Sequence, residues 1–286
     1  MRAGPKRTKH IKLGKYLKPE TPVHEIATAE KGLVFCGTDA RAADVLSIML
    51  NRGTRRVPVI DSDTGRPVGM ISTTDMLDFL GAGDRHALFS KRKVGLDVRA
   101  DKIMKTGIRT IDLNQDVSTA IGVMRSHNVG GLPLTKKGKL AGFVSERDII
   151  KRIKGRVGIR TRDVMRKKPF FVKERFPVFD VARIMVHGPY RRLPVVKDGI
   201  LVGIVTPYDI LKYLNKRRGL RDLRSDRSPI MRAMNPNVLY AKAGNRLHDA
   251  IDIMLKRHVG GLPVVEGDEM DIVGIITERD IIDLLE

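Results

Sequence analysis

The stretch GFVSERD, at residues 142–148, recurs near the end of the chain as GIITERD, at residues 274–280. Two looser copies, GMISTTD at 69–75 and GIVTPYD at 203–209, keep the same order of residue types. Each copy, called the phrase below, has a glycine, two apolar residues, a serine or threonine, two variable residues and an aspartate. Its fourfold occurrence predicts a repeat protein, because self-similarity along a chain is the signature of stacked structural units.

Each phrase stands in the same surroundings. An apolar–Pro–apolar step comes before it, and a methionine lies nine residues before each proline. Ahead of each methionine, apolar residues recur at offsets of 0, 3, 4 and 7, which is one face of a helix. A second apolar run follows each aspartate. We therefore predict four units, each with the order strand, helix, strand, strand, helix (β-α-β-β-α). The prolines are Pro58, Pro133, Pro194 and Pro263, and the methionines are Met49, Met124, Met185 and Met254.

The four units also pair off. The first and third share Arg-Arg before the proline step, whereas the second and fourth share Gly-Gly there and Glu-Arg-Asp later. This pattern predicts a duplicated two-unit module, roughly 32–156 and 157–286. The expected boundaries are a basic arm at 1–31 and repeats at 32–84, 85–156, 157–218 and 219–286.

Composition limits the classes of protein. The chain has 286 residues, 42% of them hydrophobic, and a single cysteine, Cys36, so a disulfide within the chain is excluded. No apolar run approaches the roughly 18–20 residues that a membrane span needs, and the basic N-terminus lacks the apolar segment of a signal peptide. We expect a cytoplasmic protein without membrane contact. The net charge of +21 predicts attraction to polyanions.

The phrase has two interpretations at each copy. Serine or threonine followed three residues later by an acid, ahead of an apolar run, is a helix-capping pattern. The same geometry suits a nucleotide, because a helix start attracts phosphate and an aspartate accepts hydrogen bonds from both ribose hydroxyls. The two roles are compatible. The candidate residues are Ser72 with Asp75, Ser145 with Asp148, Thr206 with Asp209, and Thr277 with Asp280.

The proline step, a turn and Gly-x-x-Ser/Thr-x-x-Asp between two amphipathic helices resemble the CBS domain family. Two such repeats form a pair called a Bateman module. Four in one chain resemble the CBS proteins that include the gamma subunit of AMP-activated protein kinase and its archaeal relatives. The resemblance covers the chain from about residue 32 to its end. It implies an α/β fold of two Bateman modules packed as a flattened disc, with ligands in the clefts between paired units and the phrase contacting phosphate and ribose.

Six arginines join the candidate ligand residues, each with a structural alternative. Arg147 and Arg279, inside the phrase, either bind phosphate or pair with the neighbouring Glu146 and Glu278. Four others precede proline steps, where basic side chains in CBS proteins often reach ligand phosphates, although a solvated pair of charges explains them equally well. These four are Arg55, Arg56, Arg191 and Arg192.

The sequence contains no recognisable catalytic constellation, metal cluster or Walker-type phosphate loop. We therefore predict a non-catalytic regulatory protein, without a prosthetic group, that senses energy state by binding AMP, ADP or ATP. The adenine preference comes from the resemblance, and the positive charge favours nucleotides over S-adenosylmethionine. We rank Asp148 and Asp280 first, because their copies combine Ser or Thr, Arg and Asp. Asp75 and Asp209 come next.

Two alternatives stay open. The basic clusters could bind DNA or RNA through phosphates, with the repeats as a ligand sensor. They are the arm (Lys6, Arg7, Lys9, Lys12 and Lys15) and the segments 151–168 and 215–224. A regulatory subunit for a kinase, another enzyme or a transporter is the second alternative. The sequence names no such partner and leaves a homodimer open.

Overall fold

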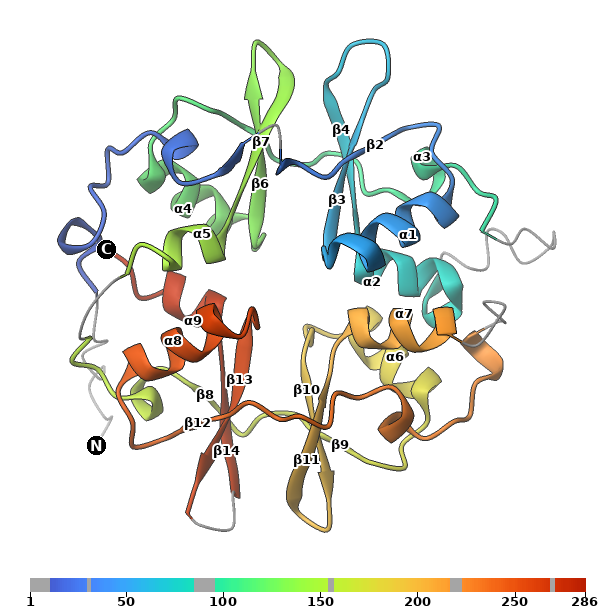
Figure 1. Cartoon of the computed structure of the whole chain (residues 1–286), viewed down its shortest axis with the longest axis vertical. Helices are drawn as coiled ribbons and strands as arrows, with labels where there is room; N and C mark the ends of the chain where they lie inside the picture. Colours follow the sequence, from blue (N-terminus) through green and yellow to red (C-terminus); the bar gives the residue numbers. More distant parts are fainter. Residues whose placement is uncertain (1–10, 30–31, 85–95, 154–156, 217–222, 268–270) are drawn as a thin grey trace, which may run out of the picture.

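The structure is a computed structural model that describes residues 11–29, 32–84, 96–153, 157–216, 223–267 and 271–286. Its described part contains the four predicted β-α-β-β-α units. Figure 1 shows repeats 1 and 2 beside each other in the upper half of the molecule, and repeats 3 and 4 in the lower half. The prediction of an α/β fold built from four repeats is confirmed.

The elements of the repeats correspond one to one. Repeat 1 contains β2 (Cys36–Gly37), α1 (Ala42–Arg52), β3 (Arg56–Ile60), β4 (Pro67–Ser72) and α2 (Thr73–Leu77), which runs into a π-helical turn, η4 (Asp78–Ala82). Repeat 2 contains β5 (Ile111–Asp112), α4 (Val117–Ser126), β6 (Gly131–Lys136), β7 (Lys139–Ser145) and α5 (Glu146–Ile150). Repeat 3 contains β9 (Val172–Lys173), α6 (Val178–His187), β10 (Leu193–Lys197), β11 (Ile200–Val205) and α7 (Pro207–Lys216). Repeat 4 contains β12 (Ala241–Lys242), α8 (Leu247–Lys256), β13 (Gly261–Glu266), β14 (Asp271–Thr277) and α9 (Glu278–Ile282).

Short elements link the repeats. They are the strands β1 (Thr28–Ala29) and β8 (Arg166–Lys167), the helix α3 (Ala100–Ile103), and single 3-10 turns at Leu13–Lys15, Val23–Glu25, Thr161–Asp163, Leu223–Ser225 and Ile230–Arg232.

Each repeat forms a small sheet around its proline step. In repeat 1 the order is β2-β3-β4, with β2 parallel and β4 antiparallel to the central β3. Pro58 lies in β3, but β2 pairs only with Val59 and Ile60, so the proline faces an open edge where its missing N–H costs no ladder hydrogen bond. The sheets of repeats 2 and 4 each gain a fourth strand, β1 and β8.

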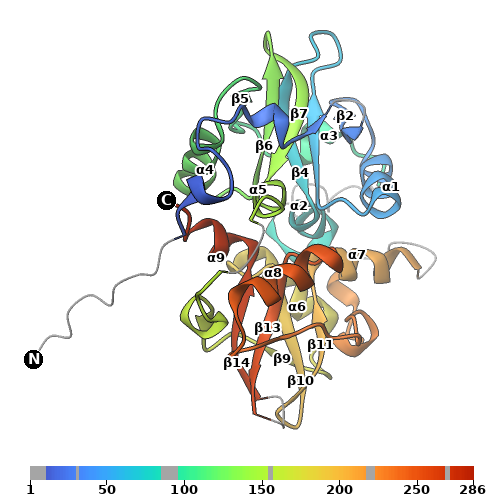
Figure 2. The ribbon, with the colours of Figure 1, turned by 60° about the vertical axis from the view of Figure 1, so that its left-hand side comes forward.

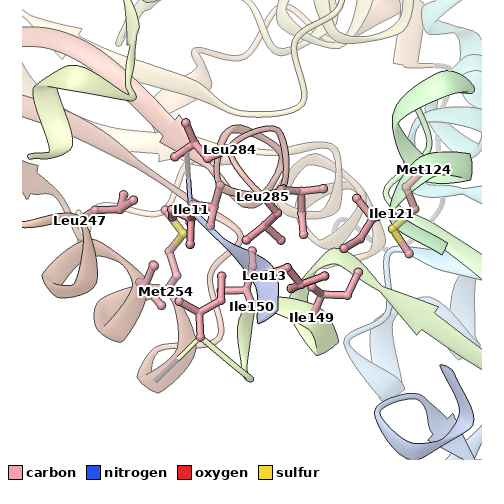
Figure 3. Packing of buried hydrophobic residues seen from close by; sticks show 14 of the residues in the cluster. Ile11, Leu13, Ile121, Met124, Ile149, Ile150, Leu247, Met254, Leu284 and Leu285 are labelled. Carbon is pink, nitrogen blue, oxygen red and sulfur yellow. The ribbon is translucent and has the colours of Figure 1, made fainter. Parts of the chain in front are cut away.

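The first helix of each repeat buries the face that the sequence predicts. In α4 the buried residues are Val117, Ala120, Ile121 and Met124, and the same four offsets are buried in α1, α6 and α8. The buried side chains form two cores. One core joins repeats 1 and 3, and the other joins repeats 2 and 4. Figure 3 shows part of the second core, in which Met124 of repeat 2 and Met254 of repeat 4 contribute to one cluster.

Part of the segment that the sequence analysis sets apart as a basic arm belongs to this second core. Ile11 and Leu13 are almost fully buried, and the Ile11 N–H donates to the carbonyl of Leu284 at 2.8 Å. Figure 2 shows the C-terminus beside this segment. The strand β1 then adds to the free edge of β7. Apolar residues among the lysines decide this placement, because burying them stabilises the fold. Lys6, Arg7 and Lys9 lie outside the described residues.

Candidate functional site

The aspartate of every phrase lies in the first turn of a helix and helps to cap that helix. In all four copies its Oδ2 accepts one hydrogen bond from the serine or threonine hydroxyl and one from the backbone N–H of the same residue. The capping interpretation is therefore confirmed, and it leaves Oδ1 for another partner. The hydroxyl-to-carboxylate distances are 2.6 Å for Ser72–Asp75, 2.6 Å for Ser145–Asp148, 2.5 Å for Thr206–Asp209 and 2.6 Å for Thr277–Asp280.

The glycine of the phrase lies close against the linker that crosses it. A Cβ on Gly69 or Gly203 would overlap the sulfur of Met104 or Met234, and one on Gly274 would lie 2.5 Å from the sulfur of Met165. On Gly142 a Cβ would lie 3.0 Å from the carbonyl oxygen of Thr28. A side chain would require the methionine to move at Gly69, Gly203 and Gly274, and would crowd a backbone oxygen of the linker at Gly69, Gly142 and Gly274. The glycine thus lets this linker lie close to the phrase.

A cavity of about 510 Å³ runs between the repeats. It brings together the hydroxyl and the aspartate of two of the four phrases, Ser145 and Asp148 of repeat 2 and Thr206 and Asp209 of repeat 3. Four of the candidate arginines line the same cavity, namely Arg55, Arg56, Arg147 and Arg192. The remaining candidates do not line it, namely Ser72, Asp75, Thr277, Asp280, Arg191 and Arg279.

The cavity also has apolar walls that the sequence analysis did not select. Leu33 and Val34 precede the first strand of repeat 1, and Leu239 occupies the corresponding stretch of repeat 4. The periodic helix pattern does not reach these residues, so only their place before each first strand could have indicated them. An apolar wall beside a few convergent polar groups is the usual composition of a small-molecule site.

The two arginines of the phrase join repeats 2 and 4. Arg147 Nε lies 2.7 Å from Glu278 Oε1, and Arg279 Nε lies 2.8 Å from Glu146 Oε1. Pairing with a glutamate was one of the two expected roles, but each arginine chooses the glutamate of the other repeat. Arg279 also donates to the carbonyls of Met124 and Val129. The second helices of repeats 2 and 4, α5 and α9, therefore meet through reciprocal ion pairs.

Arginines from the proline steps extend this cluster to the centre of the molecule. Arg55 Nη2 lies 3.5 Å from Glu278 Oε2. A Cβ on Gly260 would clash with Arg192 and Glu278, and one on Gly130 would lie 2.7 Å from Arg56 Nη2. The Gly-Gly pairs thus make room for the arginine–glutamate cluster, whose members are Arg55, Arg56, Arg147, Arg192, Arg279, Glu146 and Glu278.

The central cluster holds more positive than negative charge. Five arginines against two glutamates leave an excess of three positive charges. Burial, and then the charge of Arg55, lower the pKa of Arg192 to about 10, and the same two causes lower the pKa of Arg56. Arg147 also keeps a buried nitrogen, Nη2, without a hydrogen-bond partner in the described part of the chain. An anion entering the cavity would relieve this unbalanced charge.

Arg191 has a different role from its neighbour. Its Nη1 donates to the carbonyls of Met185 and Gly188 at the end of α6, at 2.8 and 3.0 Å. These bonds satisfy carbonyls that the end of a helix leaves without partners. Arg191 therefore supports the helix end, whereas Arg192 lines the cavity.

Two further cations contact the phrases, and the sequence analysis did not select them. Lys105 Nζ lies 2.8 Å from Asp75 Oδ1, and Arg166 Nε lies 2.6 Å from Asp280 Oδ1. Both stand in linkers between repeats, more than 25 residues along the chain from the aspartate that each contacts. Lys105 and Arg166 occupy corresponding positions in two linkers, and this correspondence was the signal in the sequence that could have indicated them.

The CBS domain family model matches residues 23–82, 98–155, 162–216 and 229–286. The chain belongs to this family of regulatory modules, as the resemblance implied. It is 32% identical over 270 residues to protein MJ1225 of Methanocaldococcus jannaschii, covering 87% of this chain and 93% of that protein. The crystal structure of MJ1225, described as a candidate archaeal homologue of g-AMPK, superposes with a TM-score of 0.84 over 92% of this chain and 99% of that chain, at 29% identity.

A second solved structure, of a Pyrococcus horikoshii protein, covers 92% of this chain and 98% of its own at 22% identity, with a TM-score of 0.59, and so shares the fold. A Thermofilum pendens protein encoded in a ribosomal RNA operon is 26% identical over 265 residues, covering 87% of each chain.

Within the described ranges, no group of three or more His, Cys, Asp or Glu side chains is placed to hold a metal ion. No helix in the same part of the chain has both the length and the apolar character to cross a membrane. Cys36 is buried, and burial, with the charges of Asp39 and Asp44, raises the pKa of its thiol to about 12. Its thiolate is therefore strongly disfavoured at neutral pH.

Proposed function

We propose that this protein binds adenine nucleotides, AMP, ADP or ATP, and acts as a non-catalytic, energy-sensing regulatory protein. One observation carries the proposal. The cavity of about 510 Å³ is lined by Asp148 and Asp209 together with arginines that hold excess positive charge. A volume of this size is in the range of small-molecule sites.

Each part of a nucleotide has a matching group in the cavity. Oδ1 of Asp209, and Oδ1 of Asp148 once it releases Lys151, can accept ribose hydroxyls, because Oδ2 of each aspartate already serves the helix cap. Arg55, Arg56 and Arg192 attract the phosphates, and guanidinium groups suit phosphate geometry. Leu33, Val34 and Leu239 offer an apolar surface to the base. The choice of adenine rests on family membership and on the likeness to MJ1225.

In segment 151–168, which the alternative of nucleic-acid binding uses, the structure leaves Arg160, Lys167 and Lys168 exposed. Several of its basic side chains contact the protein itself: Lys151 pairs with Asp148, Arg162 with Glu266, and Arg166 with Asp280. Arg152 donates to the carbonyl of Glu25. Most of segment 215–224 lies outside the described residues. A low-salt mobility-shift assay with DNA and RNA separates the two proposals, because binding through phosphates weakens steeply with salt.

Isothermal titration with AMP, ADP, ATP, GTP and S-adenosylmethionine tests the proposal. We expect Asp148→Asn and Asp209→Asn each to weaken one site by roughly ten- to a hundredfold, because a hydrogen bond to a charged group contributes about 1.5–3 kcal/mol. Asparagine keeps an oxygen for the cap, so the fold stays intact. Asp116→Asn, which alters the cap of α4 at Thr119, is the matched control and should bind as wild type does. Absence of binding by wild type at submillimolar nucleotide would refute the proposal.

A further inference from the structure

One position opposite each phrase differs between the four copies. In each copy, the residue that follows the phrase glycine pairs with one residue of a linker. The pairs are Phe143 with Thr28, Met70 with Lys105, Ile275 with Arg166, and Ile204 with Asn235. These four linker residues, called the facing residues, therefore occupy equivalent places. Two are neutral and two are cationic. All four are exposed.

The two cationic facing residues form ion pairs with the phrase aspartates beside them. Asp75 and Asp280 use Oδ2 for the cap and Oδ1 for the ion pair with Lys105 or Arg166, at 2.8 and 2.6 Å. The Asp75 side chain is 4% exposed and that of Asp280 is 7% exposed. Both oxygens of each carboxylate are thus engaged, and a ribose diol would have to displace a charged partner.

The neutral facing residues leave their aspartates open to the cavity. Thr28 and Asn235 line it together with Asp148 and Asp209. Within the described residues, Oδ1 of Asp209 has no ion-pair or hydrogen-bond partner. Oδ1 of Asp148 lies 3.2 Å from Lys151 Nζ, but Lys151 stands one turn further along the same helix end and not on the facing linker. The three cations are similarly exposed, at 55% for Lys151, 58% for Lys105 and 59% for Arg166, so exposure does not distinguish the pairs. The difference is that Lys151 belongs to the aspartate's own helix, and Asp148 still lines the cavity.

Aromatic residues add to the difference at Asp280. Phe170, four residues after Arg166, stacks directly on Tyr190, with ring centroids 4.9 Å apart and planes 22° from parallel. The corresponding residues of repeat 4 are Leu239 and Val259, which line the open cavity. The two rings therefore meet each other at the place where the other site has two aliphatic walls.

We propose that Lys105 and Arg166 are built-in cationic plugs. They hold Asp75 and Asp280 in ion pairs, so the protein takes up nucleotide at the Asp148 and Asp209 sites and at neither of the other two. The facing residue, and not the phrase, decides which of the four sites is open. This inference rests on the proposed function and specifies which of its sites are used.

Exchange of the facing residues tests the inference, with ADP as the probe and titration calorimetry as the measurement. Wild type should bind two ADP per chain. Lys105→Thr, which copies the residue at position 28, should bind three. Conversely, Thr28→Lys and Asn235→Lys should each bind one. Lys139→Thr removes an exposed lysine elsewhere on β7 and should leave the value at two.

The outcomes separate this inference from the proposed function. Three or four ADP bound to wild type, or a value of two for Lys105→Thr, would overturn the plugs while leaving nucleotide binding intact. No binding by wild type and by Lys105→Thr would overturn both proposals. Crystals of wild type and of Lys105→Thr soaked in ADP give a second measurement. We expect ligand density beside Asp75 in the variant alone, and density there in wild type would contradict the plug.

Discussion

The two contacts between the modules are built differently from the same motif. Where repeat 2 meets repeat 4, α5 packs on α9 within an apolar core and also through the pairs Arg147–Glu278 and Arg279–Glu146. Where repeat 1 meets repeat 3, α2 packs on α6 and α7 within an apolar core. The phrase has Glu-Arg at its variable positions in the first contact, and Thr-Thr and Pro-Tyr in the second. These variable residues thus specify how the modules join, while the serine or threonine and the aspartate keep a constant geometry.

The largest expected effect breaks the charged contact. Glu278→Ala removes the glutamate that pairs with Arg147 and Arg55, and leaves Glu146 as the nearby negative charge for Arg192. Loss of one member of a buried ion pair costs about 3–5 kcal/mol. We expect the free energy of unfolding, measured by urea denaturation, to fall by about that amount. Glu266→Ala, which breaks the exposed pair with Arg162, should cost at most about 1 kcal/mol. An equal effect of both variants would show that the central pair is no more than a surface contact.

The contact between repeats 1 and 3 should be weakened by a substitution that removes buried apolar atoms. Leu77 in α2 is fully buried in the core that joins repeats 1 and 3. Leu77→Ala should lower the free energy of unfolding by about 2–5 kcal/mol, through lost burial and the cavity that remains. The loss should not change between pH 5 and pH 8, because no charge is involved. Ile281→Ala in α9 is the matched variant at the contact between repeats 2 and 4. Because it removes only apolar packing, its loss of unfolding free energy should also be independent of pH.

A smaller effect concerns the polar link between repeats 1 and 3. Tyr208 Oη donates to the carbonyl of Leu50 at 3.2 Å. Tyr208→Phe keeps the ring and removes this bond, so we expect a loss of about 0.5–1.5 kcal/mol in urea denaturation. Tyr16→Phe, on the surface of the other core, is the control and should change the stability less. A loss above about 3 kcal/mol for Tyr208→Phe would mean that this contact, too, depends on polar groups.

The smallest expected effect is a difference in pKa between the two glutamates of the charged contact, Glu146 and Glu278. Burial raises the pKa of Glu146 above its ordinary value, despite Arg279 and Arg56. Burial acts in the same direction on Glu278, but Arg55, Arg147 and Arg192 outweigh it and lower its pKa. On acidification Glu146 should therefore take up a proton first and Glu278 last. Carbon-13 NMR titration of the two carboxyl groups measures the order, and the reverse order would contradict it.

The free energy of unfolding should change with pH in two phases, first as Glu146 takes up a proton and then as Glu278 does. Glu146 binds a proton more readily in the folded chain than in the unfolded chain, so its protonation stabilises the fold as pH falls through its raised pKa. Glu278 acts oppositely. Its stabilising contribution is complete above the unfolded-state pKa and is lost as pH falls through its lowered folded-state pKa. Glu146→Gln should remove the first of these two phases from the pH dependence of unfolding and leave the second.

Much of the site could be predicted from the sequence because it depends on neighbours along the chain. The cap between Ser145 and Asp148 spans three residues, so residue types and spacing were sufficient to predict it. Which of the four sites is open, by contrast, could not be predicted from neighbouring residues in the sequence. Asp148 and Asp280 carry the same Glu-Arg-Asp triplet, yet one lines the cavity and the other is paired with Arg166. The difference lies in residues that are distant in sequence.

The sequence by itself determined the four repeats, the buried face of each first helix, the strand pairs around the proline step and the caps, because helical period and hydrogen bonds over a few residues fix these features. Only the tertiary structure decided that repeat 1 shares a core with repeat 3 and repeat 2 with repeat 4, and that Arg147 selects Glu278 at a separation of 131 residues. It also decided that Lys105 and Arg166 face an aspartate while Thr28 and Asn235 face a cavity. Such contacts arise when whole modules pack, and the charge that results at each site is a property of the assembled fold.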